Sequence, residues 1–187
     1  LAGSELPGWA VSVASGIPGA AAAGGLDGDG FPEIFLVDDQ GQALSGSLTT
    51  AIVAAGVLEK EPGATILHNC ICSKAVPEVA RERGGTPVRT RVGHSFIKSV
   101  MAETGAAFGG EHSAHYYFAR NFNADSGLIA SLMVMAEVGR SGQALSVVRK
   151  PYERYAASGE INTEVTDANA VIERISEPPK AFILDME

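Results

Sequence analysis

Short apolar runs alternate with longer segments of helical periodicity through the middle of the chain. The strand candidates are residues 33–38, 64–68, 87–91 and 106–108. The helix candidates are residues 47–58, 73–83, 95–104 and 126–138. Strands that alternate with helices of about ten residues are typical of α/β folds, in which helices cover both faces of a sheet. The pattern predicts an α/β fold: a three-layer-like domain with a mainly parallel sheet.

The segment before this pattern has a different composition. It holds one strand candidate at residues 9–13 and an alanine- and glycine-rich stretch at residues 18–25, which offers little to pack. We therefore interpret residues 1–32 as the remnant of a preceding domain and residues 33–143 as the α/β domain itself.

The segment after this pattern also differs. Residues 144–157 predict a linker helix, with Pro151 tolerated only near a first turn or a kink. A strand is expected at residues 159–165, and Asp167 is a suitable cap for a helix that follows it. We interpret residues 144–187 as this linker helix and the truncated start of a further α+β domain.

Composition and charge narrow the classes of partner. The 187 residues are 45% hydrophobic, and 22 acidic against 14 basic residues give a net charge of −8. An acidic chain does not favour nucleic acid or an anionic membrane as a general partner, because both need a basic face. The apolar stretches 51–58 and 128–138 are shorter than the roughly 20 residues that span a bilayer. No basic and apolar leader opens the sequence, so a cytoplasmic location is expected.

The two cysteines, Cys70 and Cys72, lie two residues apart in an apolar run. A disulfide between residues so close on a strand is strained, so we expect reduced thiols. Together with His68 they could be taken for a metal-binding set. Three such residues crowded on one apolar strand are more often core residues, and the zinc hypothesis is therefore disfavoured.

The most informative polar segment is residues 109–115, which directly follows a strand candidate. In parallel α/β sheets, ligands gather at the carboxyl ends of the strands. Glu111 and Ser113 are two residues apart, so in an extended loop they can point the same way, toward neighbouring sugar hydroxyls. The alternative is a polar turn followed by core-facing aromatic residues at 116–118.

A second segment, residues 89–98, has the order strand, glycine turn and helix. Gly93 and His94 fall at a helix N-terminus, where backbone N–H groups favour an anion, and Arg91 and Lys98 add positive charge. This pattern indicates a phosphate site. The alternative is that His94 merely caps the helix and that the basic side chains are solvated.

Taken together, the two segments resemble the α-D-phosphohexomutase family of phosphomannomutases and phosphoglucomutases. The resemblance rests on residues 92–98 and 110–115 with their spacing, and continues through 125–127, 152–155 and 159–161. It implies the third domain of that family, flanked by pieces of the second and fourth. It also implies that Glu111 and Ser113 recognise sugar hydroxyls, and that His94 and His115 lie near the transferred phosphoryl group.

The activity implied by this resemblance is phosphoryl transfer between the 1- and 6-positions of hexose phosphates, through a hexose bisphosphate and a phosphoserine of the enzyme. The family's Ser-His-Asn-Pro serine loop does not occur in these 187 residues, nor does its Arg-Pro-Ser-Gly/Asn-Thr-Glu-Pro phosphate loop. We therefore expect no turnover by this chain alone. The competing hypothesis is a non-catalytic α/β module that binds a sugar phosphate or a partner; oligomerisation is left open.

The metal loop of the family corresponds to residues 26–33, where the resemblance implies Asp27 and Asp29 as Mg²⁺ ligands. Phe31 stands where the family has a third aspartate, so the Mg²⁺ site should be weak without a phosphate ligand. Two alternatives stay open for this segment: a β-propeller type of calcium loop that adds Glu33, and a plain acidic turn. A further departure is Ile71, which stands where many members have a lysine.

Overall fold

The computed structural model describes residues 20–24, 33–157, 159 and 164–176 of the chain. The chain divides into two compact units, Leu1–Tyr155 and Ala156–Glu187. The strands of the first unit are β1 (Ala20–Gly24), β2 (Glu33–Val37), β3 (Thr65–Asn69), β4 (Thr86–Thr90), β5 (Phe108–Gly110), β6 (Tyr116–Phe118) and β7 (Ala124–Asp125). Its helices are α1 (Gly46–Lys60), α2 (Ala75–Glu82), α3 (His94–Thr104), η1 (Ala119–Asn121), α4 (Gly127–Ser141), α5 (Leu145–Val148) and η2 (Lys150–Tyr152).

Five strands form the main sheet in the order β4-β3-β5-β6-β7. Strand β3 lies in the middle of three parallel strands, where Ile66 pairs with Pro87 of β4 and with Phe108 of β5. Strands β6 and β7 extend the sheet in the antiparallel sense. The predicted α/β class with a mainly parallel sheet is confirmed, whereas β6 and β7 had not been predicted as strands.

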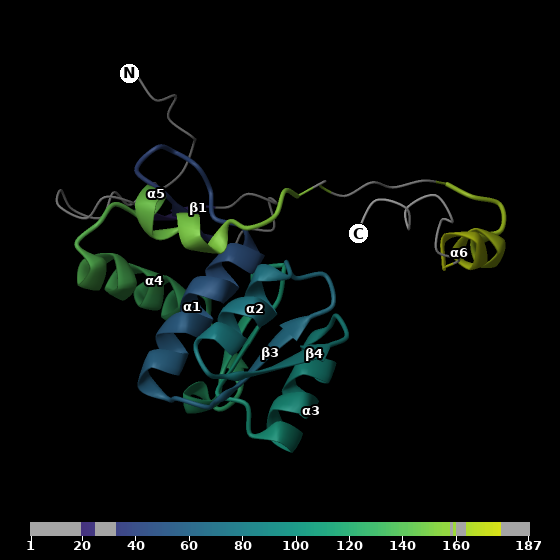
Figure 1. Ribbon diagram of the computed structural model, residues 1–187, viewed down its shortest axis with the longest axis horizontal. Coiled ribbons are helices and arrows are strands. Elements are labelled where there is room, and N and C mark those ends of the chain that lie inside the picture. The colour runs from purple at the N-terminus through teal and green to yellow at the C-terminus, as the bar shows by residue number, and fades with distance from the viewer. Residues whose placement is uncertain (1–19, 25–32, 158, 160–163, 177–187) are drawn as a thin grey trace, which may run out of the picture. The chain divides into compact units, whose positions relative to one another are not determined.

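Helices lie on both faces of the main sheet (Figure 1). Alternate residues of its strands face these opposite layers. Ile66 belongs to the core formed with α1, α2 and α4, whereas its neighbour Leu67 packs with Ile97 and Met101 of α3. In β6, Tyr116 and Phe118 face the first core and Tyr117 faces the second. These two cores on either side of one sheet give the three layers predicted from the sequence.

Helices α1 and α3 illustrate how the sequence sets the depth of burial. Helix α1 lies between the sheet and two other helices and buries small and branched side chains around most of its circumference. Helix α3 covers the opposite face alone and buries only Ile97 and Met101, which are four residues apart. It therefore leaves its remaining side chains, including those at its N-terminus, available to solvent.

Strand β2 does not join the parallel sheet. It pairs antiparallel with β1, with Val37 opposite Ala20, in a separate two-stranded sheet. After β2 the chain reverses in a turn in which the Asp38 carboxylate accepts hydrogen bonds from the N–H groups of Gln40 and Gln42. This turn leads the chain into α1.

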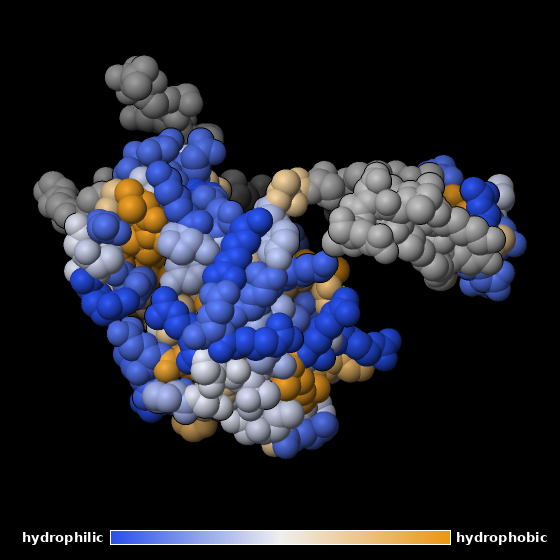
Figure 2. Space-filling view, in the orientation of Figure 1, coloured by the Kyte–Doolittle hydropathy of each residue, from blue (hydrophilic) through white to orange (hydrophobic). Residues whose placement is uncertain are grey.

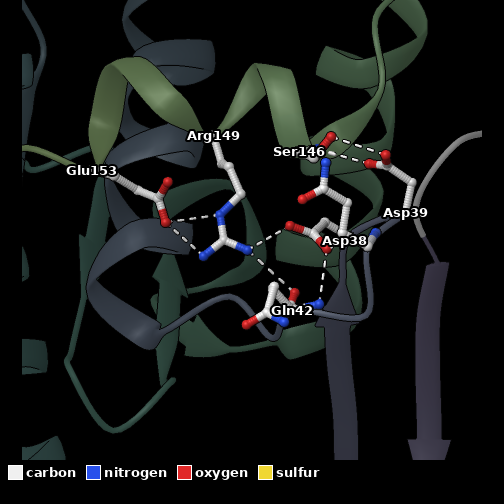
Figure 3. A network of polar contacts seen from close by, with 7 residues as sticks. Asp38, Asp39, Gln42, Ser146, Arg149 and Glu153 are labelled. Atoms are coloured by element: carbon white, nitrogen blue, oxygen red, sulfur yellow. Dashed lines mark hydrogen bonds and ion pairs between the residues drawn. The ribbon is translucent and has the colours of Figure 1, made fainter.

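A polar network fastens that turn to the segment after α4 (Figure 3). Arg149 donates to the Asp38 carboxylate at 2.7 Å and to both the carbonyl oxygen of Gln42 and the Glu153 carboxylate. Asp39 accepts from the backbone N–H and the hydroxyl of Ser146, each at 2.9 Å. We call these six residues, Asp38, Asp39, Gln42, Ser146, Arg149 and Glu153, the clasp.

The clasp predicts a loss of stability in acid. Burial alone would raise the pKa of the Asp38 carboxyl, but the N–H of Gln42 and the guanidinium of Arg149 outweigh it and hold this pKa below its ordinary value. A lowered pKa stabilises the fold above the unfolded value of about 3.9, and this contribution is lost as the pH falls through the folded value. Urea unfolding between about pH 5 and pH 2 should show this loss, with a shallower pH dependence in Asp38→Asn. Equal slopes in the two proteins would contradict the assignment.

The segment after α4 differs from the predicted linker helix at 144–157. Two short helices, α5 and η2, replace a single long one, and Pro151 lies at the start of η2, where its missing N–H costs least. Both helices belong to the first unit, and their residues Leu145, Val148 and Tyr152 are part of its larger core.

The second unit contains α6 (Ala168–Ser176). The predicted cap is confirmed, since the Asp167 carboxylate accepts a hydrogen bond from the N–H of Ala170 at 3.0 Å. The strand expected at 159–165 falls mostly outside the described residues, as does the strand expected at 9–13. The division of the chain at residues 33 and 144 stays a prediction.

The face shown in Figure 2 is mostly hydrophilic, with separate hydrophobic spots. Among the residues whose exposure is described, Phe122 is the most exposed large apolar residue, at 95%. Within the described residues, every helix is too short or too polar to cross a bilayer.

Candidate functional site

The two segments singled out in the sequence meet at the carboxyl ends of β3, β4 and β5. These strands are neighbours in the sheet and run in parallel, so the loops that follow them emerge at the same edge. Asn69 ends β3, the 91–93 turn follows β4, and the 111–115 loop follows β5. We refer to this group of loops as the strand-end site.

Glu111 lies at the centre of the strand-end site and is 1% exposed. One carboxylate oxygen accepts hydrogen bonds from the N–H of Gly93 at 3.1 Å and from the Asn69 amide at 3.3 Å. The other accepts from the Tyr117 hydroxyl at 2.9 Å. A carboxylate with donors on both oxygens matches the ionised form, which only accepts. Glu111 therefore ties together all three loops of the site.

This bonding also sets the state of His94, the first residue of α3. The Tyr117 hydroxyl donates a hydrogen bond to Glu111. Its oxygen can therefore accept a hydrogen bond from the His94 ring, whose Nδ1 lies 2.5 Å away. The partners thus assign a proton to Nδ1, so in the neutral form of this imidazole the lone pair lies on Nε2. Burial and the hydrogen bond to Glu111 raise the pKa of Tyr117, so its hydroxyl keeps its proton at neutral pH.

His115 is held through the same ring nitrogen, but directly by a carboxylate. Its Nδ1 lies 2.7 Å from one oxygen of Asp125, whose other oxygen accepts the N–H of Tyr116. Since a carboxylate accepts, this pair also places a proton on Nδ1, and in the neutral form of the ring the lone pair again lies on Nε2. The ring centroids of His94 and His115 are 4.4 Å apart. The two histidines, which lie 21 positions apart in the sequence, form a pair.

The 111–115 loop is packed against the start of α1. Gly46 lies so close to it that a Cβ at this position would collide with the carbonyl oxygen of His112 and approach the nitrogen of Ala114 to 2.8 Å. The Ser47 hydroxyl bonds Nδ1 of His112 at 2.8 Å. Ser113, at the tip of the loop, is exposed.

Residues 110–115 resemble the Gly-Glu-x-Ser-Gly-His loop of the phosphohexomutase family, and Ala114 stands where that loop has its later glycine. Its φ of 68° lies in the left-handed region, which is strained for a residue with a Cβ. The glycine of the family pattern therefore has a conformational explanation, and this chain adopts the same turn with alanine.

The remaining predicted residues lie beside this centre. The N–H of Gly93, expected to receive an external anion, instead donates to Glu111. The Arg91 guanidinium lies 4.7 Å from the centre of the Phe96 ring, at an open hollow of about 490 Å³ lined also by Cys70, Arg89, Thr90 and Val92. Lys98 is exposed on α3.

The three residues weighed as a zinc site, His68, Cys70 and Cys72, differ in their exposure to solvent. His68 is buried, and burial lowers its pKa. Cys70 is exposed, whereas Cys72 is half-buried and donates to the carbonyl oxygen of Gly110. Burial raises the pKa of the Cys72 thiol to about 11, so this thiol is protonated at neutral pH.

The Mg²⁺ ligands predicted from the sequence, Asp27 and Asp29, fall outside the described residues. In the described part of the chain, one group gathers three potential metal-binding residues: His94, His115 and Asp125, with one ligand atom of each within 4.8 Å of the others. Mg²⁺ prefers oxygen ligands, so a group dominated by imidazole nitrogen does not fit it.

The chain is similar in sequence and in fold to known proteins. Residues 45–155 match the family described as phosphoglucomutase/phosphomannomutase, alpha/beta/alpha domain III. The chain belongs to the phosphoglucomutase/phosphomannomutase family. The matched range begins at the cap of α1 and ends at the boundary between the two units, so it contains the whole strand-end site.

Members of the phosphoglucomutase/phosphomannomutase family resemble the chain in sequence. A phosphomannomutase of Methanocaldococcus jannaschii is 38% identical over 152 residues, which are 81% of this chain and 34% of the relative. A phosphomannomutase of Salmonella montevideo is 40% identical over 151 residues, 80% of this chain and 33% of the relative. The chain thus spans about a third of the length of the curated relatives it matches.

A solved structure of the same family supports the fold. The crystal structure of a phosphoglucomutase/phosphomannomutase family protein from Burkholderia thailandensis matches with a TM-score of 0.60 and 27% identity. The match covers 66% of this chain and 27% of that protein.

Sequence reasoning missed three residues that organise the site: Asn69, Tyr117 and Asp125. Tyr117 carried a readable signal, because in a three-residue aromatic strand the middle side chain must face away from its neighbours. Asp125 was part of the family resemblance without an assigned role. Nothing in the sequence marks Asn69 as a partner of Glu111.

Proposed function

We propose that this chain is the sugar-recognition domain of a phosphohexomutase, an isomerase of carbohydrate metabolism that moves a phosphoryl group between the 1- and 6-positions of hexose phosphates. The observation that carries the proposal is the pair of imidazoles, His94 and His115, beside the exposed Ser113 at the carboxyl edge of the parallel strands. The membership of the family supplies the substrate class.

Each residue of the site has a distinct part in this proposal. The Nε2 lone pairs of His94 and His115 can accept a proton from a sugar hydroxyl, and the protonated rings can balance the charge of a phosphoryl group. The Ser113 hydroxyl hydrogen-bonds a sugar hydroxyl. Arg91 and Lys98 add positive charge at the rim, where an anionic substrate approaches.

Glu111 is proposed to act mainly by positioning. Sugar contact would require its buried carboxylate to exchange at least one of its bonds to Gly93, Asn69 and Tyr117. Direct contact with a sugar hydroxyl, expected from the resemblance of the loop to the family, remains part of the proposal for the ligand-bound state. The two roles differ in their effect on stability: loss of the positioning bonds of Glu111 lowers the melting temperature, whereas loss of a sugar contact alone lowers only the affinity.

The second candidate function is a non-catalytic module that binds a sugar phosphate or a partner. Its support is the sequence, which contains no Ser-His-Asn-Pro loop to carry the phosphoryl group. Under the first function the ligand is a hexose phosphate or hexose bisphosphate; under the second it is a sugar phosphate or a partner. A weak Mg²⁺ site at Asp27 and Asp29 and a cytoplasmic location stay part of the first proposal.

Calorimetric titration with mannose 1-phosphate and glucose 6-phosphate tests the site. Loss of a neutral hydrogen bond in Ser113→Ala should weaken binding about threefold to tenfold, and loss of a charge-assisted bond in His115→Gln about tenfold to a hundredfold. Both side chains are at least partly exposed, so the melting temperatures should stay near that of the wild type. Glu111→Gln should lower both the affinity and the melting temperature.

Ser99→Ala is the matched control for Ser113→Ala, because Ser99 is an exposed serine on α3, away from the strand-end site, whose hydroxyl donates to Glu103. Unchanged affinity in Ser113→Ala and His115→Gln would contradict the proposed site. A bisphosphate-primed mutase assay separates the two functions: turnover by the chain alone would contradict the expectation that it lacks its phosphoryl carrier.

A further inference from the structure

The His94, His115 and Asp125 group has features that phosphate recognition does not require. One ligand atom of each residue lies within 4.8 Å of the others, before any metal ion is bound. Ligand atoms around a tetrahedral ion with bonds of about 2.0–2.2 Å are roughly 3.3–3.5 Å apart. The ring centroids of His94 and His115 are 4.4 Å apart, so small rotations about their side-chain bonds can bring one nitrogen of each ring onto a common ion.

Both imidazoles are already oriented as metal-binding histidines are. In metal sites a ligating histidine donates its other N–H to a carboxylate, a carbonyl or a similar acceptor, which fixes its tautomer and makes the free nitrogen more basic. Asp125 plays this part for His115, and the Tyr117 hydroxyl, backed by Glu111, plays it for His94. Each ring thus has Nε2 available to bind a metal ion through its lone pair. Within the described residues, no hydrogen-bond partner of either Nε2 is seen.

The site is open to an ion from solvent. His94 is exposed, and the side chains of His115 and Asp125 are 39% and 31% exposed. The donors are two imidazole nitrogens backed by a carboxylate. This set suits Zn²⁺, Ni²⁺ or Cu²⁺ and disfavours Mg²⁺, which requires oxygen ligands and retains its water.

We propose that His94 and His115 bind a transition-metal ion of the Zn²⁺ class through their Nε2 atoms, with Asp125 as the outer partner that orients His115. Water fills the remaining positions of the ion. This site is separate from the Mg²⁺ site expected at Asp27 and Asp29, and it does not depend on the chain being part of a mutase.

Calorimetric titration of the 187-residue chain with Zn²⁺ tests the proposal. The titrations use a Cys70→Ser/Cys72→Ser background, so that thiols cannot contribute ligands. One Zn²⁺ ion per chain should bind at sub-millimolar concentration. His94→Gln and His115→Gln should each abolish this binding, and Asp125→Asn should weaken it about tenfold to a hundredfold, as outer-shell changes do in other sites.

His112→Gln is the matched control, because His112 is an exposed histidine of the same loop that bonds Ser47 and lies outside the group. Its Zn²⁺ affinity should equal that of the background protein. Melting temperatures without metal establish that each variant is folded. Mg²⁺ in large excess should leave the Zn²⁺ titration unchanged, because it does not compete for imidazole nitrogen.

Two results would overturn the proposal. One is the absence of sub-millimolar Zn²⁺ binding by the folded background protein. The other is Zn²⁺ binding that survives in His94→Gln and His115→Gln or disappears equally in His112→Gln. Binding lost in the first two variants and retained in the third would support it.

Discussion

Arg149→Met should lower the free energy of unfolding of the α/β unit by about 3 kcal/mol, the lower end of the cost of breaking a buried ion pair. The Arg149 side chain is 13% exposed and that of Asp38 is 3% exposed. Without the guanidinium, the Asp38 carboxylate stays buried with only two backbone N–H groups as partners. Urea unfolding at neutral pH measures the change.

Arg140→Met provides the control for the Arg149 prediction. Arg140 also pairs with glutamates, Glu137 and Glu59, but its side chain is 54% exposed. Exposed pairs contribute little, because water and salt screen them, so this variant should differ far less from the wild type. Equal destabilisation by the two substitutions would contradict the role given to burial in the clasp.

Gly46→Ala should lower the unfolding free energy by about 3 kcal/mol, at the upper end of the usual cost of overpacking. The added Cβ would collide with the backbone of the 111–115 loop rather than with a flexible side chain, so only movement of the loop or of α1 can relieve the clash. This movement should also displace Ser113 and His115. We therefore expect hexose phosphate binding to weaken in the fraction that remains folded.

Gly139→Ala is the matched control for this substitution. Gly139 is also a helical glycine, in α4, and a Cβ there would meet nothing within 4 Å. Alanine favours the helix by up to about 1 kcal/mol over glycine, so this variant should be as stable as the wild type or more stable. A Gly46→Ala protein with wild-type stability would show that the loop is not held as described.

The strands and helices of the central unit followed from apolar runs and periodicity: α2 and α3 bury one stripe of side chains each, and β3 is buried on both faces. The two strands β6 and β7 did not, since three and two residues are too short to display a period. The predicted helix at 144–157 was interrupted for a local reason: Pro151 removes an N–H donor, and the chain restarts as η2.

The site was predicted in outline but not in its bonding. The positions of Glu111, His94 and His115 after neighbouring parallel strands are enough to bring their loops together. Burial of the Glu111 carboxylate depends on Asn69, Gly93 and Tyr117, three residues that are distant in sequence and unremarkable by type. Such partnerships arise from the register of strands and the start of a helix, which periodicity alone does not fix.

The clasp also determines how the α/β unit would carry mechanical tension. Asp38 and Asp39 directly follow β2, and Ser146 and Arg149 lie just beyond α4, so the chain enters and leaves this unit through one set of bonds. A pull between the segment before β2 and the segment after η2 would load these ion pairs and hydrogen bonds first. The parallel strands that hold the two histidines would come under load only after the clasp and the core packing of Leu145, Val148 and Tyr152 had given way.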